Sequence, residues 1–108
     1  MKLMTKAIEQ RFAQVGSQEE TPFKEKIIIA KFFNPSGIGT WYATEYNPEE
    51  RLFFGFCSLF GDHNDEWGYF SLTELESIKT PPFGLGIERD MHFGEKPCGE
   101  VNIINCYD

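Results

Sequence analysis

Residues 52–60 constrain the fold most, because this run is apolar on both of its alternating faces. A strand of this kind must be covered on both sides, so we predict an interior strand of a sheet. Gly55 in its middle predicts a neighbour packed closely against the backbone. Eleven phenylalanines and an aromatic content of 16% also favour a β-rich core. We place Phe54 and Phe56 in that core, with Ile29 from a second strand.

Four further segments have strand character. Residues 26–33 are β-branched and aromatic, and the turn-forming residues 34–39 follow them. Residues 40–46 alternate between two side-chain faces, as a half-buried strand does. Residues 67–70 predict a short fourth strand, and residues 101–104 are compatible with a short edge strand.

Two segments have the period and the capping residues of helices. Residues 3–15 repeat apolar side chains at helical spacing, with Thr5 as the expected N-cap and Gly16 as the stop. The Ser-Leu-Thr-Glu sequence of residues 71–74 has the capping-box pattern and predicts a second helix near residues 72–79.

These segments predict an α+β protein with a single domain over residues 1–108. Its main feature is an antiparallel sheet of about four or five strands, with an N-terminal helix and a second helix near residues 72–79. Residues 94–108 lack a clean period and are expected to form a C-terminal extension.

The charge of the chain bears on its partners and its location. A formal net charge of −7 opposes binding to phosphate backbones, so we do not expect direct nucleic-acid binding. No apolar run reaches the roughly 18 residues of a membrane span, and the amino terminus lacks signal-peptide features. Three cysteines without an export signal indicate reduced thiols. We therefore expect a cytoplasmic protein.

Two clusters resemble metal sites only in part. The acidic loop at residues 62–66 has oxygen ligands, but a calcium loop starting at Asp62 needs glycine and glutamate where Trp67 and Thr73 stand. The other cluster, made of His92, Cys98 and Cys106, lacks the paired short spacings of a structural zinc site. We expect no metal and no cofactor.

The sequence offers no clear catalytic group. Glu88, Arg89 and Asp90 are consecutive, so an extended backbone points them to opposite sides, with His92 nearby. Cys57 has no local signature of a nucleophile and is expected to be a small buried hydrophobe. We assign no catalytic residue and do not expect an enzyme.

Several segments together resemble an uncharacterised bacterial family of small proteins, a domain of unknown function often encoded on plasmids and other mobile elements. The similarity runs from Lys2 to Phe93 and leaves residues 94–108 outside it. It implies a bacterial host, a cytoplasmic setting and an accessory role on transferable DNA, and it brings no assigned reaction. The segments that carry it are Lys2-Leu3-Met4-Thr5, Lys31-Phe32-Phe33-Asn34-Pro35, Thr40-Trp41-Tyr42-Ala43-Thr44-Glu45, Phe53-Phe54-Gly55, Glu66-Trp67-Gly68-Tyr69-Phe70-Ser71-Leu72-Thr73-Glu74-Leu75-Glu76 and Ile87-Glu88-Arg89-Asp90-Met91-His92-Phe93.

Three functions are compatible with these observations. The first is a non-enzymatic protein-interaction or accessory module of a mobile element, with another protein as partner, because acidic charge and surplus aromatic residues suit protein contact. The second is an acidic decoy that imitates nucleic acid and occupies a host DNA-processing or defence enzyme. The third is a small metal-dependent hydrolase that uses residues from the set Asp62, His63, Glu88, Asp90 and His92.

Four residues are the candidate interaction patch: Glu45, Trp67, Glu88 and Arg89. They lie in the segments that carry the resemblance, and they belong to residue types that are seldom fully buried. The structural alternative is an ion pair covered by an aromatic ring, which contributes little to stability when it is exposed.

Overall fold

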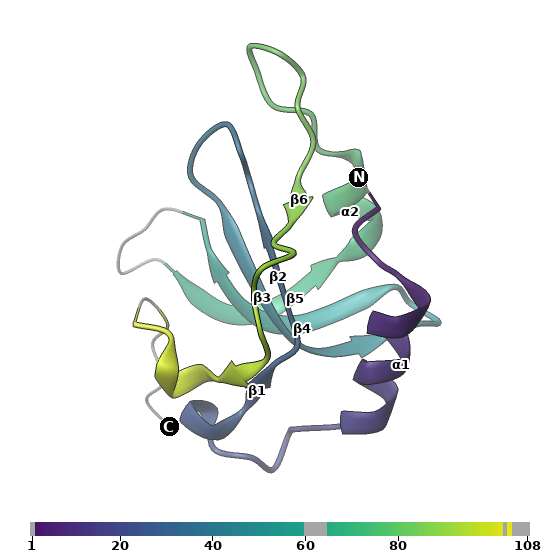
Figure 1. Ribbon diagram of the computed structural model, residues 1–108, viewed down its shortest axis with the longest axis vertical. Helices are drawn as coiled ribbons and strands as arrows, with labels where there is room; N and C mark the ends of the chain where they lie inside the picture. The colour runs from purple at the N-terminus through teal and green to yellow at the C-terminus, as the bar shows by residue number, and fades with distance from the viewer. Residues whose placement is uncertain (1, 60–64, 103, 105–108) are drawn as a thin grey trace.

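The computed structural model describes residues 2–59, 65–102 and 104, and it shows a compact α+β domain (Figure 1). Five antiparallel strands form the main sheet in the order β5-β4-β3-β2-β6, and β1 pairs with β7 in a separate small sheet. The predicted fold class is confirmed. The elements, in chain order, are α1 Lys6–Val15, η1 Phe23–Glu25, β1 Ile27–Ile28, β2 Ala30–Phe33, β3 Thr40–Asn47, β4 Leu52–Ser58, β5 Glu66–Ser71, α2 Leu72–Ser77, β6 Glu88–Arg89, β7 Lys96–Pro97 and η2 Cys98–Glu100.

The apolar strand β4 lies inside the sheet between β3 and β5, as predicted. Gly55 lies opposite Ala43 in the register. A Cβ atom at Gly55 would lie 1.8 Å from the backbone oxygen of Tyr42, a distance that no side chain can adopt. The close neighbour predicted at Gly55 is therefore the backbone of β3, and position 55 requires glycine.

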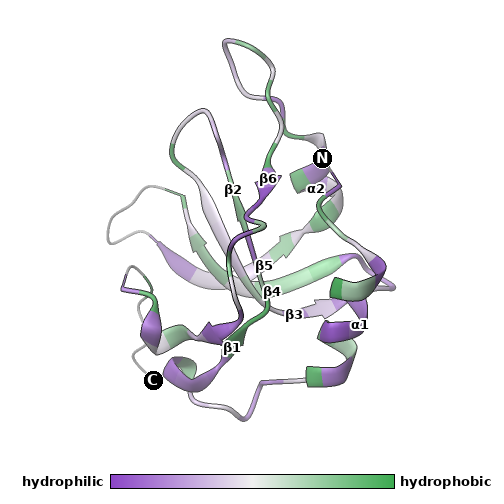
Figure 2. Cartoon of the chain, in the orientation of Figure 1, coloured by the Kyte–Doolittle hydropathy of each residue, from purple (hydrophilic) through white to green (hydrophobic). Residues whose placement is uncertain are grey.

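The two faces of the main sheet are covered by different parts of the chain. We call the face beneath α1 and α2 the helix face, and its core includes Phe53 and Phe70. The other face, which we call the open face, has a smaller core. Figure 2 shows the alternating hydrophobic and hydrophilic bands of α1, as expected of a helix with one face on a core. The open-face core consists of Ile28, Tyr42, Phe56, Cys98 and Ile104.

One of the three predicted core residues is wrong. Ile29 and Phe56 are buried, whereas Phe54 is only half-buried and the adjacent Phe53 is fully buried. Successive residues of a strand point to opposite faces, so only one of two adjacent phenylalanines can enter the helix-face core. The sequence contains no signal that distinguishes them.

The predicted helix ends are largely confirmed. Thr5 Oγ1 accepts a hydrogen bond from the Ile8 N–H at 3.2 Å, and Gly16 ends α1 with a positive φ of 70°. Ser71 Oγ accepts from the Glu74 N–H at 3.2 Å, which caps α2 as the capping-box pattern indicates. The second helix is shorter than expected, because it ends at Ser77.

The C-terminal part differs from the prediction. The expected edge strand is absent at Val101 and Asn102, and the preceding residues form β7 and η2. The Cys98 N–H donates to the Lys26 carbonyl at 2.8 Å, and the Cys98 side chain is fully buried. Residues 96–98 are therefore built into the domain, and they cover one end of the open face.

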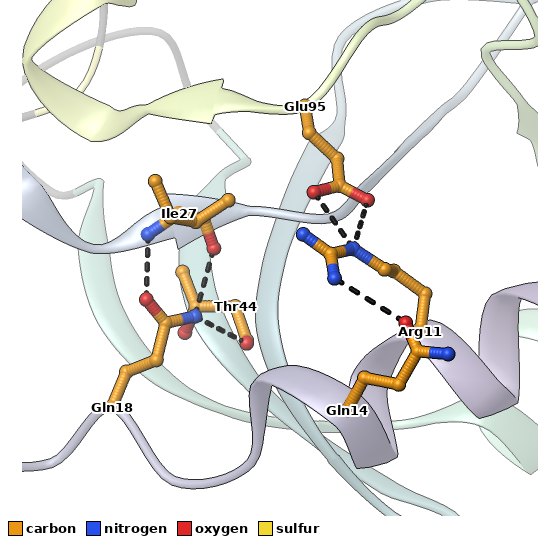
Figure 3. A network of polar contacts seen from close by, with 6 residues as sticks. All are labelled: Arg11, Gln14, Gln18, Ile27, Thr44 and Glu95. Carbon is orange, nitrogen blue, oxygen red and sulfur yellow. Dashed lines mark hydrogen bonds and ion pairs between the residues drawn. The ribbon is translucent and has the colours of Figure 1, made fainter.

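The predicted strand at residues 26–33 is divided into β1 and β2, and a buried glutamine side chain stabilises the division. Gln18 Nε2 donates to the carbonyls of Ile27 at 2.9 Å and Thr44 at 2.8 Å, and its Oε1 accepts from the Ile27 N–H at 2.6 Å (Figure 3). The buried ammonium of Lys26 donates to the Gln18 backbone carbonyl. We call the contacts of Gln18 with Ile27 and Thr44 the Gln18 clamp.

Removing the Gln18 clamp should destabilise the protein. Gln18→Ala leaves three backbone groups without their partner, and an unsatisfied buried group costs about 1–3 kcal/mol. We therefore expect the free energy of unfolding to fall by about 3 kcal/mol in urea denaturation. Gln14→Ala, on the exposed side of α1, is the matched control and should change it by less than about 0.5 kcal/mol. Equal midpoints for Gln18→Ala and Gln14→Ala would show that the clamp contributes nothing.

Candidate functional site

The structure separates the four predicted patch residues into two pairs. Trp67 lies on β5 and Arg89 on β6, which are the opposite edges of the main sheet. Glu88 is beside Arg89 on β6, whereas Glu45 lies opposite Phe54 in the β3–β4 register, and the Phe54 ring centroid is 6.0 Å from that of Trp67. Glu45 and Trp67 therefore share surroundings from which Glu88 and Arg89 are separated.

Arg89 contacts the amino-terminal segment. Its Nη1 donates to the carbonyl of Lys2 at 2.6 Å and to that of Leu3 at 3.1 Å. The Leu3 side chain is 3% exposed and belongs to the helix-face core. Arg89 thus holds a core residue in place from the sheet edge. Glu88 borders a cavity of about 590 Å³ beneath residues 85–87, together with two lysines, Lys2 and Lys79.

Other candidate groups have structural contacts or lie outside the described residues. Asp90 Oδ2 is 3.5 Å from the Lys31 ammonium, and Asp90 Oδ1 accepts from the His92 N–H at 2.9 Å. Burial, with a smaller contribution from the charge of Glu66, raises the pKa of Cys57 to about 11, so its thiol stays protonated near neutral pH.

The two metal-site candidates lie partly outside the residues that the structure describes. Asp62, His63, Asn64 and Cys106 lie outside the described residues. Within residues 2–59, 65–102 and 104, no group of three or more histidine, cysteine, aspartate or glutamate side chains is placed to hold a metal ion. The same part of the chain contains no helix with the length and apolarity needed to cross a membrane.

A β-bulge in β3 creates the most distinctive surface feature. Ala43 lies opposite Gly55, but Glu45 lies opposite Phe54, so Thr44 is an extra residue in β3. Without the bulge, Glu45 would share the face of Ala43, which belongs to the helix-face core. The bulge instead turns Glu45 to the open face, beside Phe54. Thr44 Oγ1 donates to the Phe54 carbonyl at 3.1 Å, and the Thr44 carbonyl is held by the Gln18 clamp.

Two adjoining hollows meet at Glu45, Phe54 and Tyr69, and we call them together the sheet groove. The larger has a volume of about 410 Å³ and extends past Glu50 to the carboxyl end of α1. The smaller has a volume of about 270 Å³ and extends toward Glu19, with Phe23 and Lys26 also in its lining.

Aromatic rings form a continuous row along the sheet groove. The ring centroids of Phe23 and Trp67 are 4.7 Å apart, and those of Phe54 and Tyr69 are 5.1 Å apart. Trp67 is 6.0 Å from Phe54 and joins the two pairs. Tyr69 is 71% exposed at the end of the row.

The charges around this row are predominantly negative. Glu19, Glu45 and Glu50 line the groove, against one lysine, Lys26. The Lys26 ammonium donates to the Gln18 carbonyl and lies 5.2 Å from the ring centroid of Phe23. Aromatic faces next to carboxylates are suited to a positively charged side chain. The sequence analysis did not include Glu19, Phe23 or Tyr69 in the candidate patch, and it assigned Phe54 to the core. Two features of the sequence point to Tyr69: its alternation with the apolar Phe70 and its position two residues after Trp67.

The contacts of Arg89 lead to a stability prediction. Arg89→Ala removes two charge-assisted hydrogen bonds to the amino-terminal segment and should lower the free energy of unfolding by about 1–2 kcal/mol in urea denaturation. Arg89→Lys should be intermediate, because an ammonium cannot reproduce the planar donor geometry. Glu88→Gln keeps the shape of the neighbouring side chain and serves as the control. Wild-type stability of Arg89→Ala would contradict an anchoring role.

Comparison with known proteins identifies one matching protein family. Neither the search of curated proteins nor the search of solved structures found a match. A family model described as "Protein of unknown function (DUF2958)" matches residues 3–99. This match extends past Phe93, where the sequence resemblance ended, and includes β7 and most of η2. The chain belongs to the DUF2958 family of proteins of unknown function.

Proposed function

We propose that this protein is a non-enzymatic interaction module, an accessory factor of a bacterial mobile element in the cytoplasm, and that it binds another protein through the sheet groove. The observation that carries the proposal is the exposure of Tyr69 at the end of the aromatic row. Exposed aromatic side chains beside a hollow are typical anchors of protein interfaces.

The incomplete cover of the open face supports this proposal. Tyr42 and Phe56 are buried beneath the C-terminal segment, whereas Phe54 is half-buried and Tyr69 is exposed. A partner that covers these two rings would remove a large apolar area from water. Association at the groove would therefore bring a clear hydrophobic gain.

The groove favours a protein partner over nucleic acid. Three glutamates line it, and the whole chain has a net charge of −7, so phosphate groups would be repelled. The decoy hypothesis is less well supported by the groove, because its lining combines carboxylates with aromatic rings. The hydrolase hypothesis has no assembled catalytic set among the described residues, since Asp90 is paired with Lys31.

Affinity capture from the bacterial host tests the proposal. Tyr69→Ser should reduce the recovery of the partner by about tenfold or more, as loss of an interface anchor does. Phe83→Ser is the matched control, because Phe83 is 82% exposed but does not line the groove. Both variants should keep the wild-type thermal midpoint.

One outcome of this capture experiment would contradict the proposal. If Phe83→Ser abolishes capture of the partner while Tyr69→Ser retains it, the sheet groove is not the binding site.

A further inference from the structure

The outer edge of β5 lies next to the sheet groove at Tyr69. Among residues 2–59, 65–102 and 104, no strand pairs with this edge. Exposed edges are usually protected by lysine, proline, a bulge or short length. The sequence of β5 has one charged residue, Glu66 at its first position, and neither lysine nor proline. Its register with β4 has no shift, and it is six residues long. The opposite edge strand, β6, has only two residues.

The hydrogen-bond pattern shows which backbone groups face outward. The Leu72 N–H donates to the Arg51 carbonyl at 2.9 Å, and Ser71 pairs with Leu52 in the unshifted register. Hydrogen-bonded and non-hydrogen-bonded pairs alternate along an antiparallel ladder. By this alternation, Phe70 points its backbone groups toward β4, and Tyr69 points its N–H and C=O away from the sheet.

Tyr69 therefore belongs both to the outer edge of β5 and to the sheet groove. Its backbone faces outward, while its side chain lies in the row with Phe54 on the open face. A strand added beside β5 would lie about 4.8 Å away and place alternate side chains on that face. A long side chain from the added strand would pass over Tyr69 into the smaller hollow, which Glu19 and Glu45 border.

We infer that the partner contributes an extended basic segment, which pairs with β5 and places an arginine or lysine side chain in the sheet groove. This inference rests on the proposed function and specifies its partner. The aromatic faces of Tyr69 and Phe54 attract a cation, and the two glutamates complement its charge. The backbone of Tyr69 supplies hydrogen bonds that are independent of the partner's sequence.

A random dodecapeptide display library provides the probe, with selection on the wild-type protein and counter-selection on the double variant Glu19→Gln/Glu45→Gln. We expect enrichment of peptides in which arginine or lysine recurs at every second position. The affinity of a synthetic enriched peptide should fall about tenfold or more in the double variant and also in 0.5 M salt. Glu100→Gln is the exposed charge control and should bind as the wild type does.

Two further measurements test the strand pairing itself. Binding should slow hydrogen exchange of the Tyr69 amide, and N-methylation of alternate peptide bonds in one of the two registers should weaken binding about tenfold without changing the charge. The inference would be overturned by equal affinity for peptides methylated in either register, or by a Tyr69 amide that binding leaves unprotected. Selection of acidic, apolar or helical peptides would overturn it as well. Formation of a β5-paired dimer that blocks the peptide would also overturn it.

The two proposals can fail separately. If capture depends on Tyr69 but selected peptides lack basic residues, the groove remains the binding site and the basic segment is wrong. If capture does not depend on Tyr69, the proposed function fails first.

Discussion

The fold and the candidate site both depend on the hydrogen bonds of one buried amide, that of Gln18. The Gln18 amide makes hydrogen bonds of the kind that a neighbouring strand would make. It bonds to both backbone groups of Ile27 and to the carbonyl of Thr44. Its contact at Thr44 falls on the extra residue of the β3 bulge, where the regular ladder is interrupted. The loop after α1, the small sheet and the main sheet are thus held together at one point.

The bulge links this structural contact to the surface. It reverses the alternation of β3, so that Tyr46 continues the helix-face core and Glu45 turns to the open face. The C-terminal segment covers only part of that face, over Tyr42 and Phe56. A charged side chain and two incompletely covered aromatic rings, Phe54 and Tyr69, are consequently adjacent. The sheet groove results from a change of register together with incomplete cover.

Local features of the fold could be predicted from the sequence, whereas features set by distant contacts could not. Thr5, Gly16 and Ser71 act through their own backbone neighbours, so their capping roles are visible in short stretches of sequence. Gly55 was recognisable because only a close neighbour requires glycine within an apolar strand. The choice between Phe53 and Phe54 and the position of the bulge depend on tertiary packing, which no local pattern encodes.

The same distinction explains the mixed result for the candidate site. Glu45 and Trp67 were identified by residue type and do lie near each other around Phe54, but Glu88 and Arg89 occupy the other sheet edge. Arg89 has the polar character of a binding residue and is placed where its guanidinium anchors the amino-terminal segment. Residue type alone does not distinguish a residue that binds a partner from one that anchors another part of the same chain. The strand order does, because it sets the distance between the two pairs.

Photo-crosslinking in the bacterial host shows whether the surface at Tyr69 contacts a partner protein. Tyr69 and, separately, Ile38 are replaced by the photoreactive amino acid p-benzoylphenylalanine. Ile38 is 70% exposed at a turn outside the groove, so it reports on non-specific encounters. We expect a discrete cross-linked species that contains another protein from position 69, and none from position 38. A discrete species from position 38, with none from position 69, would contradict this expectation.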